Sequence, residues 1–136
     1  MRALRSIGAV LVGFFATALL SVGTDAVMHA TGVFPPYPAR MPDAMFVLPG
    51  IYRAIFTAVG GYVTARLAPD HPMRHAGALA GLGLLAGLGA AAATWDLDLG
   101  PSWYTASIPA SAIPCILGGA WLSGRREPSR APAPEA

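Results

Sequence analysis

The sequence predicts an all-α membrane protein, folded as a four-helix transmembrane bundle. Hydrophobic residues make up 54% of the 136 residues and only 12% are charged, against roughly 25% charged residues in ordinary soluble domains. Four apolar segments each reach the roughly 20 residues that a helix needs to cross a bilayer. The 16 glycines and 13 prolines agree with this class, because both residues are more frequent in membrane helices than in soluble ones.

The four predicted spans cover about residues 4–30, 44–67, 74–95 and 103–123, and we place them in one domain, residues 1–123. The first span begins with basic residues, as a secretory signal does. Its apolar run over residues 7–23 is longer than the roughly 7 to 15 residues of a signal core, so we expect it to remain as a span. Residues 124–136 lack apolar bulk and are predicted to form a disordered cytoplasmic tail.

The orientation of the bundle follows from its arginines, since the chain contains no lysine. Most of them flank the spans on the side that carries both termini: Arg2, Arg5, Arg66, Arg74, Arg125, Arg126 and Arg130. The connection between the first two spans has only Arg40, and that between the last two has none. By the positive-inside rule, both termini are predicted to be cytoplasmic. Aromatic side chains gather at the predicted outer face: Phe34, Tyr37, Trp95, Trp103 and Tyr104.

In size and layout the chain resembles short four-span membrane proteins of bacteria, which implies the bacterial cytoplasmic membrane as its location. The lipid bilayer is then its first expected partner. Nucleic acid is not expected as a partner, because the formal charge is only +2 and the basic residues form no stripe interleaved with aromatic residues. The single cysteine, Cys115, has no second cysteine in the chain with which to form a disulfide.

The third predicted span carries two stripes of glycines at helical spacing: Gly77, Gly81, Gly83, Gly87 and Gly89. In lipid, helices associate through close van der Waals contact, and small residues let their backbones approach. We therefore expect the third span to be central in the bundle, or to form an interface with a second copy or another membrane protein.

The fourth predicted span contains two prolines, Pro109 and Pro114. Each proline lacks the N–H group that donates to the preceding turn of a helix. Membrane helices tolerate this loss when neighbouring groups satisfy the freed carbonyls. The spacing predicts a kinked fourth helix.

A polar cluster is predicted at the outer side of the first two spans. Asp25 and His29 lie one helical turn apart, and Asp25 lies roughly 10 Å from the connecting loop. Arg53 lies roughly 16 Å into the second span, with Tyr52 beside it in the sequence. A lone arginine near the middle of a membrane costs on the order of 2.5 to 3.5 kcal/mol. We therefore expect Asp25 and Arg53 to form an ion pair, with His29 near the outer water boundary.

The cluster leaves three functions open. The first is a structural or accessory membrane subunit, in which the ion pair fixes the register of the helices. The second is a small transporter or channel that uses the cluster as a vestibule for an ion or solute. The third is an intramembrane enzyme, which is the least supported because the chain contains no phosphate-binding loop, GxSxG or HExxH motif.

No metal or cofactor is expected. Asp25 and His29 supply two ligands of a suitable type, whereas tetrahedral zinc takes four protein ligands, or three protein ligands and a water. His71 and His75 are also one turn apart, but they lie beside Arg66 and Arg74, whose positive charges repel a cation.

Overall fold

The computed structural model describes residues 1–125, and this part of the chain contains helices and no strand. The elements in order are α1 (Arg2–Ala30), η1 (Asp43–Phe46), α2 (Val47–Leu67), α3 (Pro72–Thr94), η2 (Trp95–Leu97) and α4 (Ser102–Arg125), where η1 and η2 are short 3₁₀ helices. Of the predicted tail, residues 126–136 lie outside the described residues. Gly124 and Arg125, which we assigned to that tail, instead form the end of α4.

The four long helices are long and apolar enough to cross a membrane, which confirms the all-α class and the presence of four candidate spans. Many large apolar side chains on these helices are exposed; Leu4, Leu19 and Leu85 are each at least 70% exposed. An apolar outer surface of this kind is typical of a helix bundle whose solvent is lipid. The fold is therefore consistent with an integral membrane protein.

The helix ends lie where the backbone cannot continue regular hydrogen bonding. After α1, Gly32 adopts a φ of +75°, a conformation that glycine reaches without steric cost. The loop that follows contains four prolines between residues 35 and 42, which lack N–H donors and exclude a helix there. Pro72 occupies the start of α3, a position where its missing N–H costs nothing.

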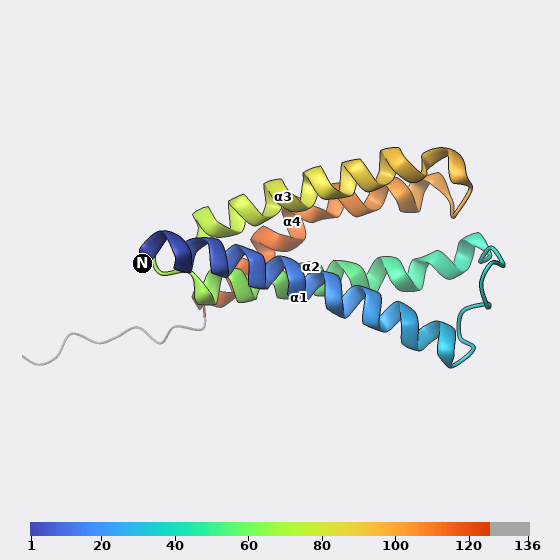
Figure 1. Cartoon of the computed structure of the whole chain (residues 1–136), viewed down its shortest axis with the longest axis horizontal. Coiled ribbons are helices and arrows are strands. Elements are labelled where there is room, and N and C mark those ends of the chain that lie inside the picture. The colour runs from blue at the N-terminus through green and yellow to red at the C-terminus, as the bar shows by residue number, and fades with distance from the viewer. Residues whose placement is uncertain (126–136) are drawn as a thin grey trace, which may run out of the picture.

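The helices form two antiparallel hairpins, α1–α2 and α3–α4 (Figure 1). The hairpins lie together at the end that carries the N-terminus and diverge toward the end that carries residues 31–42 and η2 (Figure 1). Helix α2 packs against all three other long helices. The separation of the hairpins at one end places the predicted polar cluster beside an opening.

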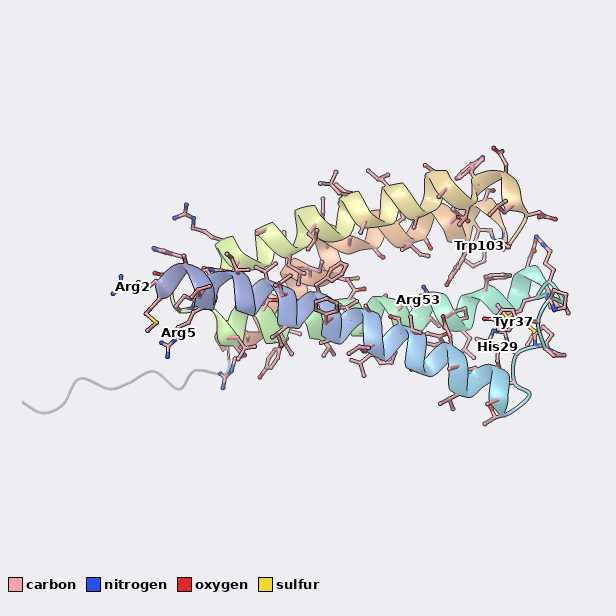
Figure 2. The ribbon with its side chains drawn as sticks, viewed as in Figure 1. Arg2, Arg5, His29, Tyr37, Arg53 and Trp103 are labelled. Carbon is pink, nitrogen blue, oxygen red and sulfur yellow. The ribbon has the colours of Figure 1, made fainter. Side chains whose placement is uncertain are left out.

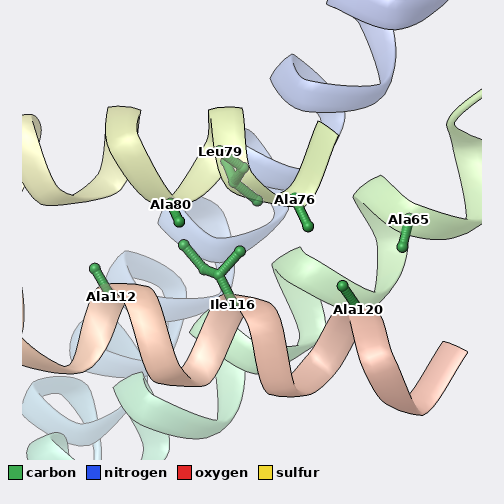
Figure 3. Packing of buried hydrophobic residues seen from close by; sticks show 7 residues of the cluster. All are labelled: Ala65, Ala76, Leu79, Ala80, Ala112, Ile116 and Ala120. Atoms are coloured by element: carbon green, nitrogen blue, oxygen red, sulfur yellow. The ribbon is translucent and has the colours of Figure 1, made fainter. Parts of the chain in front are cut away.

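The apolar core lies between α2, α3 and α4 (Figure 3). Its members are small, apart from one leucine and one isoleucine: Ala65, Ala76, Leu79, Ala80, Ala112, Ile116 and Ala120. Small side chains permit close approach of the helix backbones, which is the main source of packing energy in lipid. Leu79 and Thr64 are the largest side chains that are fully buried.

The closest crossings of the helices occur at glycines that we did not single out from the sequence. A Cβ atom added to Gly61 would overlap the carbonyl oxygen of Ile116, and one added to Gly119 would overlap that of Ala58. Where α1 crosses α2, a Cβ atom on Gly13 would lie 2.6 Å from the carbonyl oxygen of Gly60. Helix α2, rather than α3, is therefore the helix around which the tight contacts form.

The predicted glycine stripes of the third span divide between two environments. A Cβ atom on Gly87 would lie 3.1 Å from Pro109 of α4, and one on Gly83 would lie 3.4 Å from Ile116. Three further glycines would meet no atom of the described chain within 4 Å: Gly77, Gly81 and Gly89. Helix α3 packs against all three other long helices, but of these glycines only Gly83 and Gly87 face α4.

Candidate functional site

The polar cluster is built around the carboxylate of Asp25. The hydroxyl group of Tyr52 donates a hydrogen bond to Oδ1 of Asp25, and Nη2 of Arg53 donates to Oδ2 and completes an ion pair. The side chains of Asp25 and Arg53 are 24% and 32% exposed. Two consecutive residues of α2 thus bracket one carboxylate of α1. The expected pairing of Asp25 with Arg53 is present.

The guanidinium group of Arg53 retains hydrogen-bonding capacity. Its Nε atom is buried and has no hydrogen-bond partner among the described residues. An arginine carries several N–H donors in a rigid plane, and leaving a buried donor unpaired costs on the order of 1 to 3 kcal/mol. The Nε atom is therefore an unsatisfied donor within the packing, while the side chain as a whole is partly exposed.

A cavity of about 470 Å³ opens beside the ion pair, between the two hairpins. Residues from α1, the loop, α2, η2 and α4 line it, among them Asp25, His29, Arg53, Asp98 and Tyr104. Figure 2 shows Arg53 at the opening between the hairpins, on the side of the molecule that carries His29 and Tyr37. The volume of this cavity lies within the roughly 300 to 1,000 Å³ that small-molecule sites occupy.

A second cavity, of about 360 Å³, lies against α3 and α4. It shares four lining residues with the first cavity: Phe46, Arg53, Leu99 and Tyr104. Arg53 is the only charged residue in its lining. The guanidinium group therefore lies where two cavities adjoin, one lined by several charged residues and one in which Arg53 is the only charged residue.

His29 lies on the wall of the larger cavity but is held by the loop and not by Asp25. Its Nδ1 atom lies 2.9 Å from the carbonyl oxygen of Pro35, and because a carbonyl only accepts, Nδ1 must be the donor. The imidazole stacks against Tyr37, with the ring centroids 4.2 Å apart. In the neutral ring, this leaves Nε2 as an acceptor. The structure thus brings Asp25, Tyr52 and Arg53 together and holds His29 apart from them.

A surface ion-pair network joins the two loops above the larger cavity. Nη1 of Arg40 lies 2.9 Å from Oδ1 of Asp43, and its Nε lies 3.3 Å from Oδ1 of Asp98. These side chains are between 41% and 82% exposed, so each pair contributes only about 0 to 1 kcal/mol. The network adds little to the stability of the fold. Its effect is to position the loop of residues 31–42 next to η2, and both segments line the cavity.

The sequence reasoning missed Tyr104 as a member of the site. We assigned it to the aromatic belt, yet its ring packs on Phe46, with centroids 4.9 Å apart, and lines both cavities. The adjacent Trp103 is instead 47% exposed. Nothing in the sequence separates the two aromatic neighbours, because their directions depend on how α4 is rotated against α2.

The site thus belongs to a helical bundle of the membrane-spanning type, with a charged pair beside a cavity at one end. Among the described residues, no three histidine, cysteine, aspartate or glutamate side chains lie together as a metal centre requires. The chain matches no protein-family model, no curated protein and no solved structure. Its function is therefore inferred from the geometry of the site.

Proposed function

We propose that the protein is a structural or accessory subunit of the bacterial cytoplasmic membrane, in which Asp25 holds α1 against α2. The observation that carries this proposal is that both carboxylate oxygens of Asp25 are bonded by α2, through Tyr52 and Arg53. An unpaired arginine at this depth is costly. Pairing it with an acid on the neighbouring helix removes that cost and specifies which faces of the two helices meet.

A charge exchange tests this role. Asp25→Arg and Arg53→Asp alone each place two like charges together, and each is expected to prevent accumulation of folded protein. The double variant restores opposite charges and is expected to recover a monodisperse protein in detergent, measured by size-exclusion chromatography. Arg66→Asp, at an exposed residue of α2, is the matched control for a change of charge. A double variant as unstable as the single ones would overturn the structural role.

The proposal includes an orientation, with both termini in the cytoplasm. Arg2 and Arg5 lie at the end of the molecule opposite His29 and Trp103 (Figure 2), which supports the positive-inside assignment. Reporter fusions at the C-terminus and within residues 35–42 are expected to report opposite compartments. Equal signals from a reporter active only in the periplasm would contradict the four-span topology.

The uncovered side of α3 is the proposed interface with a second copy or another membrane protein. Gly77, Gly81 and Gly89 leave that side free of side-chain bulk, and no described residue covers these glycines. Close backbone approach of a partner helix would bury it.

We also propose a kink in α4. Pro109 and Pro114 both lie inside this helix, and each removes one hydrogen bond from it. Pro109 packs against Gly87, which lines the smaller cavity. A bend at this point would affect the width of that cavity.

A second candidate function is a small transporter or channel that uses the larger cavity as a solute vestibule. The cavity volume of about 470 Å³ and the presence of Arg53 in its lining favour it. We expect a mixture of small organic acids and amines to slow modification of His29 by diethyl pyrocarbonate, measured by mass spectrometry. His71 and His75 lie at the start of α3, at the opposite end of the bundle, and are internal controls. Equal modification of His29 with and without solutes would contradict a vestibule.

A further inference from the structure

We propose that the paired cavities bind the carboxylate group of a small solute with an apolar body, held by Arg53 and Tyr104. This inference rests on the second candidate function and names the chemical class of its ligand. Three features of the described residues carry it: the donors of residues that line the cavities, the pairing of the nearby acids with arginines, and the apolar walls of the cavities.

The unused donors belong to two residues that line both cavities, Arg53 and Tyr104. One N–H of Arg53 donates to Asp25. Its Nε is buried and has no hydrogen-bond partner among the described residues, and the side chain as a whole is partly exposed. The hydroxyl group of Tyr104 makes no hydrogen bond to any residue within the described part of the chain, whereas that of Tyr52 is bonded to Asp25. The partly exposed guanidinium group of Arg53 and the hydroxyl group of Tyr104 therefore belong to residues that line the same two cavities. Both groups are donors and are complementary to a ligand that accepts, and a charged acceptor gives the stronger bonds.

The two acids that line the larger cavity are each paired with an arginine. Both oxygens of Asp25 accept hydrogen bonds from α2, and Asp98 is paired with Arg40. A cationic solute would have to compete with an arginine for either acid. The smaller cavity has no acid in its lining. Arg53 is therefore the only charged residue that a solute would meet in the smaller cavity, which favours an anion over a cation there.

The walls of the cavities select a monoanion with an apolar body. Phe46 and Leu99 line both cavities, and Ile108 lines the smaller one. Transfer of a charge to apolar surroundings is costly unless it is paired. A carboxylate presents a single negative charge and two oxygens in a plane, which match the fork of a guanidinium group. A phosphate would bring more charge than this one arginine can compensate.

The test compares ligands of equal shape and different charge, using the full-length protein in lipid nanodiscs. The probes are benzoate, benzyl alcohol and benzylamine, with dissociation constants measured by ligand-observed NMR titration. We expect benzoate to bind at least tenfold more tightly than the other two. Tyr104→Phe removes only the hydroxyl group and is expected to weaken benzoate binding by about tenfold. Tyr62→Phe, on the same bundle but outside both cavities, is the matched control and should not change it.

The outcomes separate the ligand class from the vestibule. If benzyl alcohol or benzylamine binds as tightly as benzoate, the carboxylate class is wrong and the vestibule stands. If none of the three probes binds, palmitate incorporated in the nanodisc decides: binding that Tyr104→Phe weakens supports a carboxylate that enters from the membrane. Failure of all four probes would overturn the inference, and the protection of His29 from diethyl pyrocarbonate would then decide the second candidate function separately. Benzoate binding that is insensitive to Tyr104→Phe would overturn the assigned site.

Discussion

Replacement of Gly119 by alanine is expected to lower the free energy of unfolding by about 3 kcal/mol or more, at or above the upper end of the usual cost of overpacking. The added Cβ atom would overlap the backbone carbonyl of Ala58 on α2. Backbone atoms cannot rotate away as a flexible side chain can, so α2 and α4 must separate along their contact. We expect the variant to fail to accumulate as a folded, detergent-stable protein, measured by its yield and by its thermal unfolding.

The neighbouring Gly118 provides the matched control. A Cβ atom there would meet nothing within 4 Å, and alanine favours a helix over glycine by about 1 kcal/mol. Gly118→Ala is therefore expected to leave stability unchanged or slightly raised. Similar effects of the two changes would show that α2 and α4 do not cross at Gly119.

Removal of one charge from the Asp25–Arg53 pair is expected to cost on the order of 2 kcal/mol of stability. This value lies between the roughly 0 to 1 kcal/mol of an exposed pair and the roughly 3 to 5 kcal/mol of a fully buried one, because both side chains are partly exposed. Asp25→Asn leaves the guanidinium group without a counter-charge, and Arg53→Leu leaves the carboxylate alone. Thermal unfolding in detergent measures both effects.

The double variant, Asp25→Asn with Arg53→Leu, is expected to recover much of the lost stability, because it leaves no unpaired charge. Tyr52→Phe removes one hydrogen bond and no charge, so its effect should be smaller than that of either single change. Additive losses in the double variant would mean that the two side chains do not depend on each other.

The same double variant distinguishes the two candidate functions. Under the structural role, a folded double variant keeps whatever the protein supports in the cell. Under the vestibule with a carboxylate as its ligand, it folds but loses binding of benzoate, because the guanidinium group is gone. The function of the double variant in the cell and its binding of benzoate can both be measured. The structural role predicts that function is kept, and the vestibule predicts that binding is lost.

The sequence alone was sufficient to predict four apolar helices and their limits to within a few residues. Membrane-spanning length is a local property, fixed by roughly 20 consecutive apolar residues and by prolines and glycines that end a helix. The ion pair of Asp25 and Arg53 was also predictable, because both charges lie in apolar segments joined by one loop, at depths that the long arginine side chain can bridge.

The tertiary structure alone decided which small residues form the crossings and which polar groups share a cavity. Glycine spacing marked α3, yet the backbones meet at Gly61 and Gly119, because the rotation of each helix is set by packing against several neighbours at once. The same rotation turns Tyr104 toward Arg53 and leaves Trp103 exposed. Many such contacts together set the distance between the hairpins, and therefore the size of the cavity. No single segment of the sequence determines it.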